Sequence, residues 1–138
     1  MAVQAAPDFT VRLDSGSTVT LSSLRGHPVW LNFWAISCES CIVDLQAMEE
    51  VYQQYKKTGL RVVAIGVESG PEAVDLARAV GVTYAIGLDA NGTITRRYRV
   101  AVVPAHFWID RSGIISDWGL GEVAPDVMAA AVRKIVGR

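Results

Sequence analysis

Hydrophobic residues form two nearly continuous runs, the pattern of strands that are buried on both faces of a sheet. The first run lies within Pro28 to Trp34 and the second within Leu60 to Val67. Between them, residues 38 to about 57 contain neither glycine nor proline, and Gly59 follows. This segment predicts one long helix, with Ser37 at its N-cap position.

Shorter patterns predict further elements on either side of these runs. In chain order they are a hairpin of Phe9 to Leu13 and Thr18 to Leu21, a helix opened by Pro71 and closed by Gly81, a strand from Tyr84 to Leu88, a hairpin of Ala105 to Asp110 and Ile114 to Trp118, and a helix from Pro125 to about Val136. Alternating strands and helices indicate a mixed sheet with helices on its faces. We therefore expect one α/β domain over residues 1 to 138.

Composition and charge narrow the classes of function. The chain has 51% hydrophobic and 20% charged residues, as expected for a globular domain. Thirteen basic against fourteen acidic residues give a net charge of −1, which disfavours binding to nucleic acid or to an anionic membrane. The longest uncharged stretch, Gly26 to Cys38, is too short to span a bilayer, and the N-terminus lacks the features of a signal peptide. We expect neither a signal nor an anchor within this chain.

The two cysteines, Cys38 and Cys41, lie in one four-residue unit at the start of the predicted long helix. A helix N-terminus presents free N–H groups and a positive dipole end, so it stabilises a thiolate at Cys38. Cys41 begins an apolar stripe that continues with Leu45 and Met48, so we expect it to be the more buried sulfur. The spacing predicts a pair that undergoes thiol-disulfide exchange.

Four motifs carry a resemblance to a known family. They are Ala6-Pro-Asp-Phe-Thr, Leu24-Arg-Gly-His-Pro-Val-Trp-Leu-Asn-Phe-Trp-Ala leading to Cys38-Glu-Ser-Cys41, Val63-Ala-Ile-Gly-Val, and Val102-Val-Pro-Ala-His-Phe-Trp-Ile-Asp110. With them the chain resembles, over nearly its whole length, the thioredoxin-like proteins of the TlpA and ResA type, including the thioredoxins of cytochrome c maturation.

The resemblance implies a thioredoxin-like fold, in which helices flank a central mixed β-sheet with an N-terminal β-hairpin and an inserted strand-helix element. It also implies a bacterial, extracytoplasmic enzyme, periplasmic or membrane-tethered in its full-length form, that exchanges protein disulfides without a metal or organic cofactor. Reduction is the expected direction, with a membrane thiol carrier as electron donor and apocytochrome c as one candidate substrate. We expect a monomer.

The resemblance also implies how the site is built. Cys38 is expected to be the nucleophile and Cys41 the resolving thiol. A cis bond between Val103 and Pro104 would face the cysteines and leave the backbone of Val103 free to pair with an extended substrate. The family usually carries Trp before its first cysteine, where this chain has Ser37, so the aromatic rim is reduced to Trp34.

Three acidic residues near the motif have expected effects. Glu39 lies beside Cys38 and should oppose its thiolate, which argues against a very strong oxidant. Asp44 follows Cys41 by three residues, where the family carries a Glu that assists proton transfer, so we expect a proton relay there; a solvated helix acid is the alternative. Glu68, at the end of the second buried strand, is a second candidate acid or base.

A cysteine pair of this spacing also occurs in proteins with other functions. A redox-inactive binding module could hold an extended partner in the groove at Pro104. Structural zinc is disfavoured because it needs about four ligands, and His27 and His106 are far apart in the sequence. In a thiol peroxidase the peroxidatic cysteine follows a Thr or Ser by three residues, and Ala35 stands in that position. His106 is expected to be a packed or surface residue.

Overall fold

Two neighbouring parallel strands form the centre of the sheet. The computed structural model describes residues 4–137. In it, β3 (Val29–Trp34) pairs in parallel with β4 (Arg61–Val67), which pairs in parallel with β5 (Ala85–Asp89). All six residues of β3 are buried. The two hydrophobic runs are therefore covered on both faces, as the sequence predicts.

Antiparallel strands complete the sheet at both sides, in the order β2-β1-β5-β4-β3-β6-β7. On one side, β6 (Ala105–Ile109) pairs with β3, and β7 (Ile115–Leu120) pairs with β6 as the outermost strand. On the other side, β1 (Thr10–Leu13) pairs with β5 and with β2 (Thr18–Thr20). The mixed sheet and the N-terminal hairpin are confirmed.

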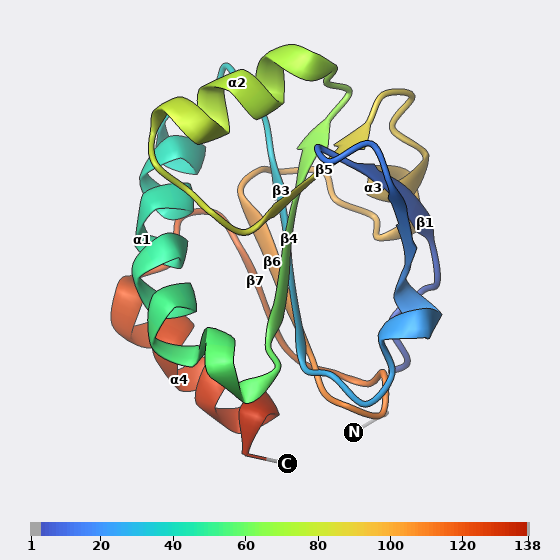
Figure 1. Cartoon of the computed structure of the whole chain (residues 1–138), viewed down its shortest axis with the longest axis vertical. Coiled ribbons are helices and arrows are strands. Elements are labelled where there is room, and N and C mark those ends of the chain that lie inside the picture. Colours follow the sequence, from blue (N-terminus) through green and yellow to red (C-terminus); the bar gives the residue numbers. More distant parts are fainter. Residues whose placement is uncertain (1–3, 138) are drawn as a thin grey trace.

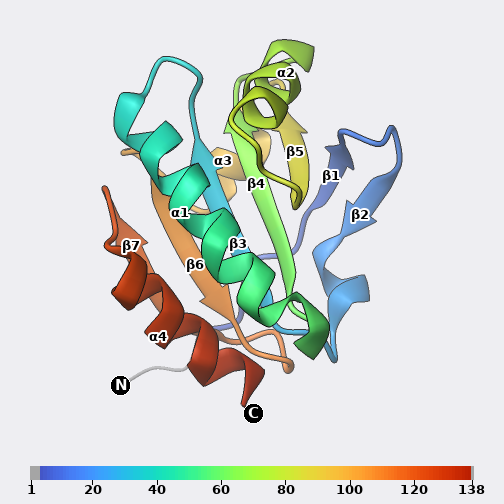
Figure 2. The same ribbon diagram turned by 60° about the vertical axis from the view of Figure 1, so that its left-hand side comes forward.

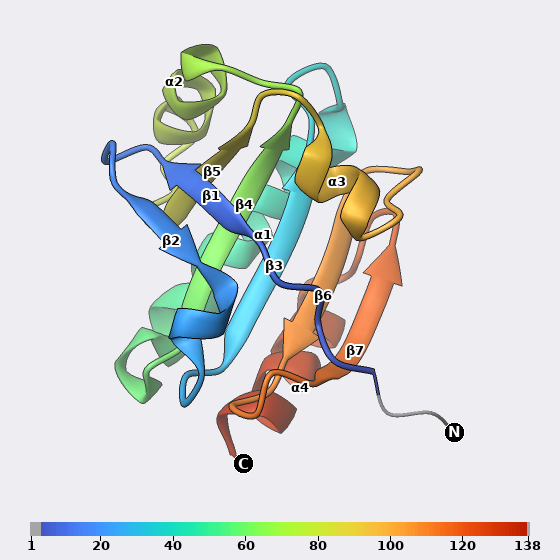
Figure 3. The same ribbon diagram turned by 90° about the vertical axis from the view of Figure 1, so that its right-hand side faces the viewer.

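Helices cover both faces of the sheet. One face carries α1 (Glu39–Tyr55), α2 (Pro71–Ala79) and α4 (Pro125–Val136) (Figures 1 and 2). The short α3 (Thr93–Arg97) and the N-terminal segment lie on the opposite face (Figure 3). Together, β5 and α3 form a strand-helix element between α2 and β6. This arrangement confirms the thioredoxin-like fold, and between residues 4 and 137 no helix has both the length and the apolar character needed to cross a bilayer.

The topology brings three segments to one edge of the sheet. The chain leaves β3 at this edge and enters α1 directly afterwards. Because β6 runs antiparallel to β3, with Phe33 opposite Ala105, the start of β6 lies beside the end of β3. The end of the parallel neighbour β4 lies at the same edge. The cysteine motif and the segment before β6 are thus neighbours in space, although they lie far apart in the sequence.

Asp14, at the turn of the N-terminal hairpin, connects the hairpin to the rest of the fold. Its carboxylate accepts hydrogen bonds from the Ile86 N–H at 3.1 Å and from the Arg78 guanidinium. Burial alone would raise the pKa of Asp14, but the hydrogen bonds from Arg78 and Ile86 and the Arg78 charge lower it below its ordinary value. The resulting stabilisation is present above about pH 4 and is lost as the pH falls through the lowered pKa of the folded state.

We therefore expect Asp14→Asn to lower the free energy of unfolding by about 1 to 3 kcal/mol at pH 7, and by less at pH 3. Urea denaturation at the two pH values measures the difference. Asp75→Asn, at an exposed position of α2, is the matched control and should change stability by less than about 0.5 kcal/mol. An Asp14→Asn effect that does not depend on pH would contradict this role for the ionised carboxylate.

Candidate active site

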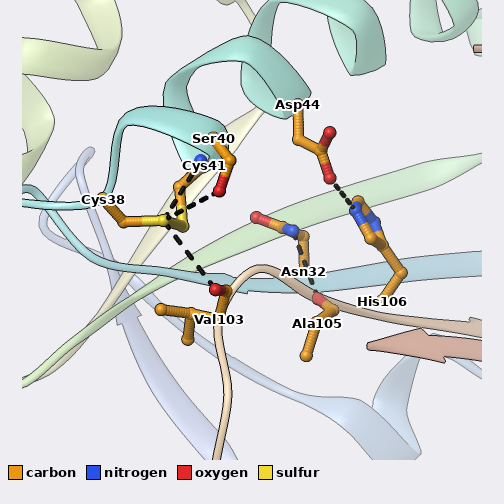
Figure 4. The surroundings of a disulfide bond; sticks show 8 residues. All are labelled: Asn32, Cys38, Ser40, Cys41, Asp44, Val103, Ala105 and His106. Carbon is orange, nitrogen blue, oxygen red and sulfur yellow. Dashed lines mark hydrogen bonds and ion pairs between the residues drawn. A yellow bond between two sulfur atoms is a disulfide. The ribbon is translucent and has the colours of Figure 1, made fainter. Parts of the chain in front are cut away.

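Cys38 and Cys41 form a disulfide at the start of α1 (Figure 4). Their Cα atoms are 5.2 Å apart, within the range that a disulfide requires. Two cysteines separated by three positions meet this requirement because the chain turns into a helix between them.

Cys38 itself is the N-cap of α1, and the prediction that Ser37 takes this position was wrong. The helix begins at Glu39, and the backbone of Cys38 is extended, with φ −101° and ψ 106°. Its Sγ accepts a hydrogen bond from the Cys41 N–H at 3.2 Å, and the Ser40 hydroxyl lies 3.5 Å from the same sulfur. A backbone N–H of the first turn thus donates to the sulfur that is expected to act as the nucleophile.

The two sulfurs differ in their access to solvent. Cys41 has an exposed fraction of 0% and lies in the hydrophobic core with Leu45 and Met48, whereas Cys38 is half-buried. This confirms that Cys41 is the more buried cysteine. An incoming sulfur atom can therefore reach Cys38 from outside, while Cys41 is placed to act on Cys38 from within.

The loop before β6 lies against Cys38. The peptide bond between Val103 and Pro104 is cis, as predicted, and the Val103 carbonyl oxygen is 3.8 Å from Cys38 Sγ (Figure 4). The Pro104 carbonyl accepts a hydrogen bond from the Gly121 N–H at 2.7 Å, which fixes the loop to the end of β7. No backbone hydrogen bond reaches Val103 from any residue between 4 and 137, and its carbonyl faces Cys38 Sγ.

The segments next to Cys38 do not form the aromatic rim expected from the sequence. Trp34 is fully buried, because β3 is covered on both faces, so its ring lies beneath the site rather than at the rim. Ile36 and Val102 are exposed instead, by 43% and 53%. Each lies close in sequence to a group at the disulfide, Ile36 to Cys38 and Val102 to Val103. Neither residue was predicted to lie at the site.

Asp44 is buried, with an exposed fraction of 1%, which excludes the alternative of a solvated helix acid. Its Oδ2 atom lies 2.8 Å from Nε2 of His106 on β6 (Figure 4). His106 is packed, as expected, but its contact with Asp44 was not predicted. Asn32 on β3 was also missed: it is buried opposite His106 and donates to the Ala105 carbonyl at 3.2 Å. In Figure 4 its amide lies between the cysteines and His106.

Glu68 lies at the same edge of the sheet as the cysteine motif, but its contacts are with β5 and the turn that follows β5. It follows the last residue of β4, has a positive φ of 49°, and is exposed. Its N–H donates to the Asp89 carbonyl at 2.9 Å, and its side chain lies beside Gly92, in the turn after β5. The structure thus places Val103, Asp44 and His106 around the disulfide (Figure 4), whereas Glu68 contacts the end of β5 and the turn after it.

Comparisons with known proteins support the same chemistry. Residues 2–117 match the AhpC/TSA family. The thiol-disulfide oxidoreductase ResA of Bacillus thuringiensis (strain Al Hakam) is 29% identical over 131 residues, which cover 94% of this chain and 76% of that protein. ResA of Geobacillus kaustophilus is 35% identical over 109 residues, which cover 78% of this chain and 63% of that protein.

A solved structure extends the similarity to the whole fold. It is the crystal structure of a Chlorobium tepidum protein assigned as the thiol:disulfide interchange protein DsbE, with a TM-score of 0.90 and 28% identity. The similarity covers 98% of this chain and 97% of that one.

Proposed function

Because the chain belongs to the AhpC/TSA family and is a thiol-disulfide oxidoreductase with a thioredoxin-like fold, we propose that it reduces protein disulfides through Cys38 and Cys41. One observation carries this proposal: an accessible cysteine caps a helix and forms a disulfide with a buried cysteine, beside an unpaired stretch of backbone at Val103. This arrangement combines an activated sulfur, a resolving sulfur and a surface for substrate.

The reaction uses the dithiol form of the pair. The Cys38 thiolate attacks one sulfur of a substrate disulfide, forms a mixed disulfide and releases the other substrate sulfur as a thiolate. Cys41 then loses its proton and attacks Cys38 Sγ. The Cys38–Cys41 bond forms, the bond between Cys38 and the substrate breaks, and the second substrate sulfur leaves as a thiolate. Two electrons pass to the substrate, whose two thiolates take up two protons.

The substrate in this proposal is an extended segment that contains a cystine. The free N–H and carbonyl groups of Val103 can pair with the backbone of such a segment, as in other cases of β-strand addition. The exposed side chains of Ile36 and Val102 would contact apolar residues next to the substrate cysteine. Pro104 holds this backbone at Cys38 through its bond to Gly121.

Reduction is supported by the charge beside the nucleophile. Glu39 is the first residue of α1 and is exposed, so its negative charge opposes the charge of a Cys38 thiolate and offsets part of the effect of the helix N-terminus. A strongly stabilised thiolate is characteristic of oxidants. Because Glu39 destabilises the Cys38 thiolate, it favours a reductant. Protein disulfides persist mainly outside the cytoplasm, so we place the enzyme there, with a membrane thiol carrier as electron donor and apocytochrome c as a candidate substrate.

Asp44 is the proposed proton acceptor for Cys41. It lies three residues after Cys41 on α1 and is shielded from solvent, so it can take the thiol proton inside the protein. Because Asp is shorter than the Glu of related proteins, this transfer can use a bridging water. Glu68 is the second candidate. Its side chain lies beside Gly92, in the turn after β5, so we rank it below Asp44 as the proton acceptor.

Reduction of insulin by the dithiol form tests the proposed function. The wild-type protein, recycled by dithiothreitol, should precipitate the insulin B chain faster than dithiothreitol alone. Binding of cystine-containing peptides without any reduction would instead show a redox-inactive binding module. Turnover of hydrogen peroxide without insulin reduction would show a thiol peroxidase, and either of these results would overturn the proposal.

A further inference from the structure

A chain of three buried polar side chains lies behind the disulfide. Trp30 on β3 donates its indole N–H to Nδ1 of His106 at 3.0 Å, and Nε2 of His106 lies 2.8 Å from Oδ2 of Asp44. The exposed fractions of Trp30 and His106 are 0%. His106 also stacks on Trp108, with ring centroids 5.3 Å apart and an interplanar angle of 10°. The imidazole ring is therefore held on its faces as well as at both nitrogens.

These contacts assign the proton of the imidazole. An indole N–H is only a donor, so Nδ1 of His106 must present its lone pair to Trp30. The hydrogen of the neutral ring then lies on Nε2, from which it is donated to Asp44. A second proton on Nδ1 would place two donors against each other in a site without solvent. Trp30 therefore holds His106 as a neutral donor to Asp44.

The same contacts leave one oxygen of Asp44 free. Oδ2 accepts the hydrogen bond from His106, whereas Oδ1 is buried and receives none from the described part of the chain. A buried carboxylate oxygen without a hydrogen bond is unfavourable, and a proton taken up there would neutralise the charge. In Figure 4 the Asn32 amide, whose Nδ2 donates to the Ala105 carbonyl, is seen between the cysteines and His106.

We propose that His106 is a positioning residue of the redox site, which orients Asp44 so that Oδ1 receives the proton that Cys41 loses. This inference rests on the relay role proposed for Asp44. In the resolving step, the proton moves from Cys41 Sγ to Asp44 Oδ1, the Cys41 thiolate forms the bond to Cys38, and the substrate sulfur leaves. His106 keeps its single proton on Nε2 throughout.

The other ionisable groups around this pair have partners of their own. Tyr84 on β5 donates its hydroxyl to the Leu45 carbonyl at 2.7 Å, and burial raises the pKa of Tyr84 far above the neutral range, so it stays protonated. On the same face of the sheet, Asp117 on β7 pairs with Lys134 on α4 at 3.3 Å. In the proposed reaction, Asp44 and the cysteines are therefore the groups that change protonation, while His106 keeps its proton.

Nuclear magnetic resonance of the two histidines provides the first test, and it does not depend on activity. Long-range ¹H–¹⁵N spectra at pH 7 should show His106 with hydrogen on Nε2 and a bare Nδ1. His27, which is half-buried and has Nδ1 3.2 Å from the Gly59 carbonyl, is the internal comparison. A hydrogen on Nδ1 of His106 at this pH would overturn the proposal.

Kinetics of three variants provide the second test, with resolution of a mixed disulfide followed from pH 5.5 to 9. His106→Leu removes the donor to Asp44 and should slow resolution by about tenfold or more and change its pH profile, while attack by Cys38 persists. His106→Gln keeps an N–H donor and should restore most of the rate. The control His27→Gln should match wild type. If His106 has a purely structural role, His106→Leu will lower the stability of the protein and leave the pH profile of resolution unchanged. That result would refute the proposal.

A fourth variant guards against the case in which His106→Leu does not fold. Trp30→Phe replaces the indole by a smaller aromatic ring without an N–H, so Nδ1 of His106 becomes free to accept a proton. Resolution should then fall at acidic pH together with the appearance of the imidazolium in the spectra. If neither appears, His106 does not act as proposed. If Asp44→Asn leaves resolution unchanged, the relay itself fails and this inference falls with it, whereas insulin reduction tests the proposed function separately.

Discussion

Cys38→Ser is expected to abolish disulfide exchange, whereas Cys41→Ser should still attack a substrate disulfide and then stop as a mixed disulfide. Cys38 is half-buried and caps α1, so it is the sulfur that an external disulfide can reach. Cys41 is fully buried and can act only on a bond already formed at Cys38. Loss of Cys38 should therefore reduce the rate of insulin reduction to that of dithiothreitol alone.

Mass spectrometry of trapped adducts measures this difference. Each variant is reduced, mixed with insulin, quenched with acid and analysed before and after dithiothreitol. Cys41→Ser should carry an insulin chain that dithiothreitol removes, and Cys38→Ser should carry none. Ser37→Ala, which changes the exposed residue next to the pair, is a matched control and should release its products as wild type does. Equal trapping by both cysteine variants would contradict the assignment of their roles.

Asp44→Asn should slow resolution of the mixed disulfide by roughly 10²-fold near neutral pH, as expected for the loss of a general base. The substitution keeps the shape of the side chain, and the amide oxygen can still accept the hydrogen bond from His106. The fold should therefore survive. Attack by Cys38 should change little, because the exposed sulfur can lose its proton to solvent.

Stopped-flow measurement of the two steps separates these effects. Attack is followed with a chromogenic disulfide in the Cys41→Ser background, and resolution is followed in the chain that retains both cysteines. Glu50→Gln removes a charge from an exposed position of the same helix and should leave both steps unchanged. If Asp44→Asn resolves at the wild-type rate from pH 6 to 9, Asp44 is not the relay, and Glu68→Gln becomes the next variant to measure.

The strands, the helices and the cysteine pair could be predicted because each produces a local pattern. Continuous hydrophobic runs mark β3 and β4, and Gly59, Pro71 and Pro125 mark where helices end or begin. The N-cap was misplaced by one residue because Ser37 and Cys38 can both accept a hydrogen bond from the first turn. Such boundaries depend on backbone angles that the residue types do not fix.

The interior of the site could not be predicted in the same way. The contact between Asp44 and His106 joins residues 62 positions apart and depends on the register that sets His106 opposite Asn32. No spacing within the sequence encodes that register. The burial of Trp34 was missed for a related reason, because a run that is apolar at almost every position does not show which end reaches the surface.

Cys38 and Cys41 are proposed to form a reversible pair that transfers electrons to substrate disulfides, and the reduction potential of this pair is the decisive measurement. The protein is equilibrated with dithiothreitol or glutathione buffers of known potential, and the dithiol fraction is measured by alkylation. We expect a single two-electron transition with a midpoint closer to about −270 mV, the range of reductants, than to about −120 mV. A midpoint of about −120 mV, or a pair that does not titrate reversibly, would contradict the proposed role of Cys38 and Cys41 in disulfide reduction.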